Sequence, residues 1–329
     1  MLQYRWQVTK VICYFHIWER RCLKVKQMKR VVRKVMRRLS RGGIKVKSAR
    51  YMADLKRMDL LKVFHHTVDY SVENNGYKIP IRLYLPKEKQ KNKGALLFFH
   101  GGGWVTESMD SYERICIKLT EATKQIVVSV EYRLAPENPF PAGFDDCYKV
   151  TKAMFTEQLI PEVPPEKVTL IGDSAGGNLV AGVCQKARDT KDFFPQRQIL
   201  IYPAVNSDYS ENSPYLSVKE NGTDFFLTAQ KMQDYIELYK SDEKDKENPY
   251  FAPIKAKDFS NLPKALILTA EFDPLRDEGE DYGRRMQNAN VDTQIYRIQN
   301  AVHGFFALGL KHYHVQESLE YICKFLEEC

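Results

Sequence analysis

A single serine, Ser174, lies where an apolar stretch of the chain breaks into glycine. Residues 168–171 read VTLI, as in a buried β-strand, and residues 178–188 form an amphipathic stretch typical of a helix. Between them stands GDSAGG, residues 172–177. A sharp turn from strand to helix holds a serine hydroxyl clear of the backbone, and small neighbours let the two elements approach. The pattern therefore predicts an elbow that presents Ser174 as a nucleophile.

A serine hydroxyl reacts at neutral pH only with help from other groups. A base must take its proton, a third group must orient that base, and N–H donors must receive the oxyanion. His100 and the glycines 101–103 follow the apolar stretch 97–99, where glycine backbone can turn its N–H groups toward a ligand. Asp273 follows the apolar residues 265–270, and His303 follows 293–298. The chain thus holds a candidate for every part of a serine-based site.

The order of these candidates separates two classes of serine enzyme. Ser174, Asp273 and His303 each come just past the carboxyl end of a predicted strand, in the order of an α/β-hydrolase triad. The tripeptide GDS also suits a trypsin-like protease, but there the histidine and aspartate precede the serine on an antiparallel barrel. Taken singly, each motif is also compatible with an ordinary glycine turn or a packed histidine. Their conjunction in this order favours the hydrolase triad.

Five motifs together resemble a known family, the hormone-sensitive-lipase-like esterases. They are HGGGW (100–104), EYRLAPE with PFPA (131–137 and 139–142), GDSAGG (172–177), DPLRDEG (273–279) and HGF (303–305). The resemblance covers roughly residues 64–328 and shows no departure at the motif positions. It implies hydrolysis of carboxylic esters through an acyl-serine, with no metal and no organic cofactor.

Carried over by position, the resemblance assigns roles to individual residues of this chain. Ser174 is expected to be the nucleophile, His303 the base and Asp273 the orienting acid. The expected oxyanion-hole donors are the N–H groups of Gly102, Gly103 and Ala175. Arg133 and Glu137 are expected to satisfy polar groups beneath the site, outside the catalytic set.

The alternation of strand and helix patterns predicts an α/β-hydrolase fold. We expect a mostly parallel central sheet of about eight strands, flanked by helices, with an antiparallel hairpin around residues 73–76 and a helical cap. A closing helix should bury Val315, Leu319, Ile322 and Leu326. The expected division is a basic leader with cap helices (1–63), the hydrolase core (64–204 and 256–329) and a cap insertion (205–255).

The predicted cap insertion is rich in aromatic residues. We expect some of them to wall an acyl pocket, although at any one position a core aromatic is the more usual role. The residues concerned are Tyr209, Tyr215, Phe225, Phe226, Tyr235 and Tyr239.

The net charge of +8 belongs to the first part of the chain. Residues 1–50 carry 16 of the 50 Lys and Arg residues and one acidic residue, Glu19, which leaves 34 basic and 41 acidic residues for the remainder. The hydrolase body is therefore mildly acidic, and no nucleic-acid partner is expected.

Within the leader, residues 28–39 have apolar and basic residues at helical spacing. This helix could cover the active site as a cap or attach to an anionic membrane; we favour the cap, since one short helix without a second anchor binds membranes weakly. The apolar run 11–18 is too short to span a bilayer and lacks a signal-peptide cleavage site. Residues 1–27 could also lie outside the natural protein, with translation starting at Met28.

The seven cysteines are an odd number without metal-ligand spacing. They are expected to be free thiols, mostly packed on helices, which favours a cytoplasmic protein. The leading hypothesis is a carboxylesterase or acetylesterase-type serine hydrolase for short-chain acyl esters of small molecules. A lipid-ester hydrolase at a membrane surface and a non-catalytic ligand-binding member of the fold are the alternatives.

Overall fold

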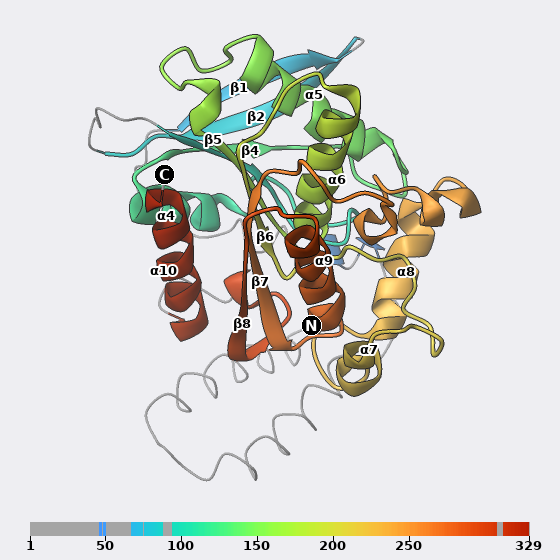
Figure 1. Ribbon diagram of the computed structural model, residues 1–329. Helices are drawn as coiled ribbons and strands as arrows, with labels where there is room; N and C mark the ends of the chain where they lie inside the picture. Colours follow the sequence, from blue (N-terminus) through green and yellow to red (C-terminus); the bar gives the residue numbers. More distant parts are fainter. Residues whose placement is uncertain are drawn as a thin grey trace, which may run out of the picture.

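An eight-stranded sheet runs through the centre of the molecule, in the strand order β1-β2-β4-β3-β5-β6-β7-β8 (Figure 1). The computed structural model describes residues 46–47, 49–50, 67–74, 76–87, 94–307 and 312–328. The strands are β1 (Thr67–Asn74), β2 (Tyr77–Tyr84), β3 (Ala95–Phe99), β4 (Ile126–Val130), β5 (Val168–Asp173), β6 (Arg197–Ile201), β7 (Lys264–Phe272) and β8 (Thr293–Val302). The predicted α/β-hydrolase architecture, mostly parallel with about eight strands, is confirmed.

The direction of each strand follows from its connection. β1 and β2 are adjacent in the chain and pair antiparallel with Asn74 opposite Tyr77, as the sequence predicted. β2 also pairs antiparallel with β4. From β4 to β8 every neighbouring pair is parallel, because the connections between them include helical crossovers.

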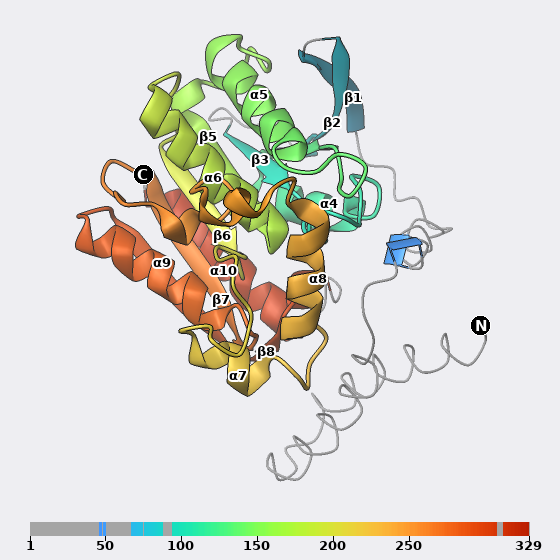
Figure 2. The same cartoon turned by 90° about the vertical axis from the view of Figure 1, so that its right-hand side faces the viewer.

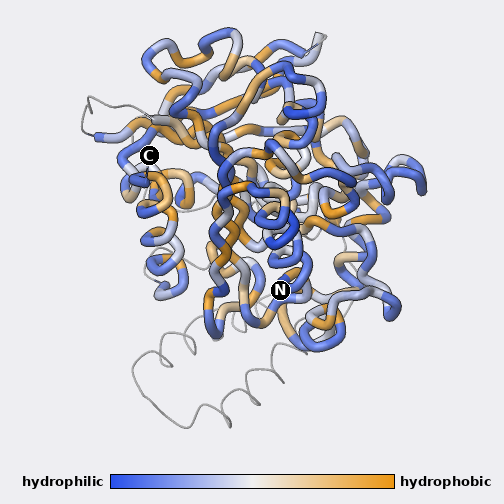
Figure 3. Tube along the Cα trace, viewed as in Figure 1, coloured by the Kyte–Doolittle hydropathy of each residue, from blue (hydrophilic) through white to orange (hydrophobic). Residues whose placement is uncertain are grey.

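The central strands are apolar because both of their faces are covered. Every residue of β3, β4, β5 and β6 is buried, and the hydropathy colouring shows orange along this part of the sheet (Figure 3). Successive side chains point to opposite faces, so Leu97 and Phe99 of β3 belong to one core cluster and Leu96 and Phe98 to the other.

Helices cover both faces of the sheet. α5 (Ala142–Thr156), α6 (Ala175–Thr190) and α9 (Arg276–Asn288) lie on one face, which is turned toward the viewer in Figure 2. α4 (Glu113–Thr123) and α10 (Tyr313–Glu327) cover the other face. α10 is the predicted closing helix: Val315, Leu319 and Ile322 are buried in it, and Leu326 packs against the same cluster.

The segment between β6 and β7 adds two helices beside the sheet. These are α7 (Leu216–Asn221) and α8 (Ala229–Tyr239). Short 3-10 helices complete the fold: η1 (Pro165–Lys167), η2 (Glu243–Glu247), η3 (Pro253–Lys255) and η4 (Phe305–Ala307). Tyr239 of α8 stacks on Trp104, with ring centroids 4.5 Å apart, and on Phe251. This stack joins the segment to the glycine loop after β3.

Several expectations can be compared with the part of the chain that the structure describes. Cys116, Cys147 and Cys184 are buried free thiols on α4, α5 and α6, and Cys323 is a free thiol on α10, as expected. The predicted basic helix 28–39 and the apolar run 11–18 lie outside the described residues. Among the helices described, none combines the length and the apolar character needed to cross a bilayer.

Candidate active site

Ser174 occupies a strained turn between β5 and α6. Its backbone angles are φ 55° and ψ −118°, a left-handed conformation that non-glycine residues rarely adopt. The turn is held by its flanks: the Ser174 N–H donates to the carbonyl oxygen of Ile201 at 2.9 Å, and the Ser174 carbonyl accepts from Asn178 N–H at 3.1 Å. A side chain on Gly176 would overlap the carbonyl oxygen of Phe99, so glycine is required for α6 to approach β3. The strand–turn–helix geometry is the one the motif predicted.

A continuous chain of hydrogen bonds starts at the serine hydroxyl. Ser174 Oγ lies 2.9 Å from His303 Nε2, and His303 Nδ1 lies 2.7 Å from Asp273 Oδ2. An ionised carboxylate only accepts hydrogen bonds, so Nδ1 is the donor toward Asp273. Nε2 of a neutral imidazole then carries the lone pair that accepts from the serine hydroxyl. This tautomer can remove the serine proton.

The acid of this chain is enclosed. The Asp273 side chain is fully buried, and its second oxygen, Oδ1, accepts the N–H of Leu275 at 2.9 Å. The side chain of His303, directly after β8, is 11% exposed, and its ring lies 4.8 Å from that of Tyr202 between centroids. One carboxylate oxygen thus fixes the loop while the other fixes the imidazole.

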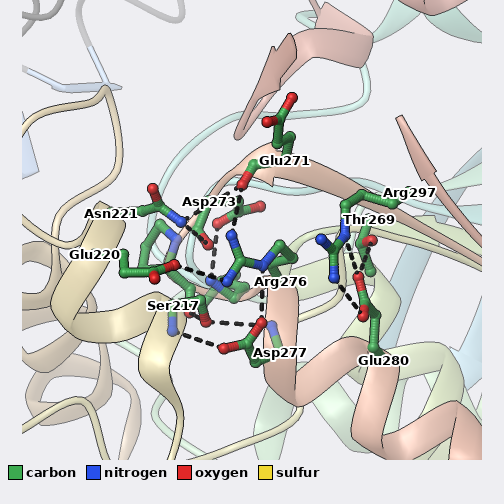
Figure 4. A network of polar contacts seen from close by, with 12 residues as sticks. Ser217, Glu220, Asn221, Thr269, Glu271, Asp273, Arg276, Asp277, Glu280 and Arg297 are labelled. Atoms are coloured by element: carbon green, nitrogen blue, oxygen red, sulfur yellow. Dashed lines mark hydrogen bonds and ion pairs between the residues drawn. The ribbon is translucent and has the colours of Figure 1, made fainter. Parts of the chain in front are cut away.

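The other acids near the carboxyl end of β7 have different partners (Figure 4). Glu271 accepts the backbone N–H of Asn300, Asp277 binds Ser217 and Arg276, and Glu280 pairs with Arg297. Within the described residues, Asp273 is the acid that reaches His303, as its place in the motif predicted.

The glycine loop after β3 is folded so that its amides are available. The carbonyl of Gly102 accepts the N–H groups of Val105 and Thr106, at 3.2 and 3.0 Å, which closes a tight turn. Gly103 has φ 61°, and a side chain there would collide with the ring of Tyr235 from α8. In the described part of the chain, no acceptor takes the N–H of Gly102, Gly103 or Ala175. These three amides can therefore serve a ligand.

Asp173, beside the nucleophile, forms a hydrogen bond with the glycine loop. The sequence motifs did not identify it as a functional residue. Its Oδ1 accepts the N–H of Gly101 at 2.9 Å, and its Oδ2 accepts the hydroxyls of Tyr112 and Tyr202 at 3.0 and 3.3 Å. Burial raises the pKa of Asp173 to about 6, while these three donors oppose the rise. The motif contains Asp173, but its partners are remote in sequence, so no local signal indicated this contact.

The two residues expected to satisfy polar groups beneath the site behave differently from each other. Arg133 does satisfy a buried polar group, because its Nε and Nη2 each donate at 2.8 Å to the fully buried Asp146. Glu137 does not lie beneath the site: its side chain is 59% exposed and forms a bidentate pair with Arg50, at 2.9 and 2.7 Å. The expectation for Glu137 was therefore wrong, since an exposed position leaves it free to bind another segment.

Arg50 connects the N-terminal segment to the loops around the site. Besides Glu137, it donates to the carbonyls of Val105 and Ala135, each at 2.9 Å. Val105 follows the glycine loop directly, and the Ala135 N–H donates to Trp104 within that loop. The guanidinium beside Glu137 lowers the pKa of that carboxyl to about 2. Arg50 thus joins two loops that approach the site from different strands.

We expect Arg50→Ala to lower the melting temperature without abolishing activity. The pair is largely exposed, so its loss together with two backbone contacts should cost about 1 kcal/mol. Deleting residues 1–27 should leave stability and kinetics intact, whereas deleting 1–50 should reproduce or exceed the Arg50→Ala effect. Thermal melts and ester kinetics on the three variants test this. An unchanged melting temperature in both Arg50→Ala and the longer deletion would show that the Arg50 contacts do not contribute to stability.

Comparison with known proteins agrees with this geometry. Residues 96–307 match the model of a family described as having the alpha/beta hydrolase fold. The chain is 37% identical over 240 residues to an arylesterase of Saccharolobus solfataricus, covering 73% of this chain and 76% of that protein. It is 32% identical to an ethyl acetate hydrolase of Pseudomonas putida, covering 71% and 74%.

A solved structure is similar over most of the chain. A hyperthermophilic esterase from the archaeon Pyrobaculum calidifontis superposes with a TM-score of 0.80 at 34% identity, covering 90% of this chain and 97% of that one. The fold and site therefore define a serine hydrolase of the α/β class. The chain belongs to the hormone-sensitive-lipase-like α/β hydrolases, and it is a carboxylic ester hydrolase.

Proposed function

We propose that this enzyme hydrolyses short-chain acyl esters of small alcohols through an acyl intermediate on Ser174. The observation that carries the proposal is the hydrogen-bond chain from Ser174 Oγ through His303 to Asp273, at 2.9 and 2.7 Å. His303 lies 129 positions from Ser174 and 30 from Asp273 in the sequence. The hydrogen bonds join the three side chains in the geometry that an acyl-transfer triad requires.

Acylation follows from this arrangement. His303 Nε2 takes the proton of Ser174 as Oγ attacks the ester carbonyl, and Asp273 stabilises the imidazolium that forms. The carbonyl oxygen becomes an oxyanion and accepts hydrogen bonds from the N–H groups of Gly102, Gly103 and Ala175. His303 then gives its proton to the departing alkoxide, the C–O bond breaks, and the alcohol leaves.

Deacylation repeats the same steps with water. His303 takes a proton from the water that attacks the acyl-serine. The oxyanion that forms accepts hydrogen bonds from the same three N–H groups. Collapse of the intermediate returns the proton to Ser174 Oγ and releases the carboxylic acid. The proposed assignments need no group beyond the side chains and amides of this chain and water.

The limit on acyl length is proposed from the packing of the segment 205–255, which we assign as a cap. Tyr235 contacts Gly103 of the glycine loop, and Phe225 stacks on Phe272 at the end of β7, with centroids 5.3 Å apart. Tyr209 and Tyr239 are fully buried and belong to the core instead of a pocket wall. Side chains held this closely favour a shallow pocket, and the names of the relatives, arylesterase and ethyl acetate hydrolase, support small esters.

Activity on a series of p-nitrophenyl esters is expected to peak between acetyl and about hexanoyl. Each added methylene gains roughly 0.8 kcal/mol while it can be buried, and nothing or a penalty once it meets the wall. The measurement is kcat/KM against chain length. A maximum at palmitate would favour the membrane-surface alternative, whose basic helix 28–39 lies outside the described residues.

The cellular compartment is part of the same proposal. The buried free thiols Cys116, Cys147 and Cys184 support a reducing environment such as the cytoplasm, where thiols persist. Fractionation of the cells that express the chain, with activity on p-nitrophenyl acetate as the marker, tests this assignment.

A further inference from the structure

The short helix α7, in the proposed cap, forms hydrogen bonds with the loop that carries Asp273 (Figure 4). Ser217 of α7 is fully buried, and its hydroxyl donates to the carbonyl of Pro274 at 2.8 Å and accepts the N–H of Asp277 at 3.2 Å. The backbone N–H of Ser217 also donates to Asp277 Oδ2 at 2.7 Å. One serine therefore makes three hydrogen bonds with two residues just beyond the acid.

Asn221, at the other end of α7, holds the beginning of the same loop. It is 4% exposed, and its Nδ2 donates to the carbonyl of Asp273 at 3.3 Å and, more weakly, to that of Glu271 at 3.5 Å. Arg276 reinforces the contact, because it donates to the Glu271 carbonyl at 3.1 Å and pairs with Glu220 of α7 at 3.0 Å.

Among the residues that the structure describes, the loop itself supplies few of the hydrogen bonds that hold it. The pairing of β7 with β8 becomes irregular between Ala270 and Phe272, just before the acid. Within the loop, Arg276 N–H donates to the Asp273 carbonyl at 3.2 Å and Leu275 N–H to the Asp273 side chain. Pro274 has no N–H to contribute. The carbonyls of Glu271, Asp273 and Pro274 thus find partners from α7 and Arg276.

We propose that Ser217 and Asn221 are positioning residues for Asp273. By fixing the carbonyls on both sides of the acid, they hold its carboxylate 2.7 Å from His303 Nδ1 and so maintain the reactive tautomer. The inference rests on the proposed role of Asp273 in catalysis. It makes the contact between α7 and the loop a part of catalysis, beyond its contribution to the packing of the segment 205–255.

The test compares Ser217→Ala, Asn221→Ala and the matched control Lys219→Ala, an exposed residue on the same helix. Each of the first two removes two side-chain hydrogen bonds to the acid loop and its flank. Each should lower kcat on p-nitrophenyl acetate by about three- to tenfold with KM nearly unchanged, because only part of the lost hydrogen-bond energy acts on the position of Asp273. The strongly downfield imidazole proton shared by His303 and Asp273 should broaden or shift upfield in the NMR spectrum. Lys219→Ala should match the parent enzyme in both measurements.

A double-mutant cycle separates positioning from simple stabilisation. Once Asp273→Asn has removed the correctly paired acid, Ser217→Ala should reduce kcat little further, because it acts through Asp273. A full multiplicative loss in that background, or an unchanged kcat with only a lower melting temperature, would overturn the inference. If Ser217→Ala does not fold, Asn221→Ala carries the same comparison at the other end of the helix.

Failure of this inference is distinguishable from failure of the proposed function. A large effect of Asp273→Asn beside normal kcat in Ser217→Ala and Asn221→Ala would reject only the positioning role. A silent Asp273→Asn would instead reject the catalytic assignment on which both depend.

Discussion

Ser174→Ala is expected to lower kcat for ester hydrolysis by about 10⁶-fold, as in comparable triads, while the protein remains folded. Ser174 is the residue whose hydroxyl faces His303, at 2.9 Å, and alanine adopts the same turn at no greater volume. The measurement is single-turnover and steady-state hydrolysis of p-nitrophenyl acetate, with circular dichroism to establish folding.

A fluorophosphonate offers an independent check on the same residue. It should label Ser174 and no other serine. The reason is that its phosphonyl oxygen can accept hydrogen bonds from the N–H groups of Gly102, Gly103 and Ala175, as the oxyanion would. Peptide mapping by mass spectrometry locates the label. Label on another serine, or turnover by Ser174→Ala close to that of the parent, would overturn the assignment of the nucleophile.

Asp273→Asn is expected to lower kcat by about 10² to 10⁴-fold, the second largest effect. An amide at this position can donate to the histidine, which favours the tautomer with a proton on Nε2 and so removes the lone pair that Ser174 needs. The fold should persist, since asparagine keeps an oxygen that can accept the N–H of Leu275.

Asp277→Asn is the matched control, because this acid follows the same strand and lies in the first turn of α9, four residues beyond Asp273. Its pKa is lowered by the hydrogen bonds from Arg276 and Ser217, which outweigh the effect of burial. The control variant would lose part of the contact with α7 but keep the Asp273–His303 bond in place, so kcat should fall about tenfold or less. The reverse ranking of the two variants would show that the wrong carboxylate has been assigned to His303.

The membrane-surface alternative and the cap model make different demands on the N-terminal segment. In the part of this segment that the structure describes, Arg50 binds Glu137 and two backbone carbonyls of the core. A liposome co-sedimentation experiment with the full chain and the chain lacking residues 1–50 separates the two hypotheses.

Local patterns in the sequence predicted most of the fold and of the candidate site. Apolar runs of strand length predicted the sheet because strands buried on both faces must be apolar. Glycine around Ser174 predicted the elbow because a strand and a helix can meet closely only without side chains. The chain order of Ser174, Asp273 and His303 predicted their meeting, because the carboxyl ends of parallel strands share one edge of a sheet.

Contacts between remote segments could not be predicted in this way. Asp173 and Glu137 belong to sequence motifs and Ser217 does not, but nothing local in the sequence identifies their partners, which are 72, 87 and 57 positions away. A polar side chain carries no local signal of which buried group it will satisfy, since that depends on how the loops pack once the sheet has formed.

The sequence by itself therefore determined which residues could do the chemistry and the sheet that brings them together, because both follow from local periodicity and from the direction of parallel strands. The tertiary structure alone decided how firmly they are held. Asp173 beneath the glycine loop, Arg50 across two loops and α7 against the acid loop are long-range hydrogen bonds, formed because buried carbonyls and carboxylates need donors wherever the folded chain can supply them.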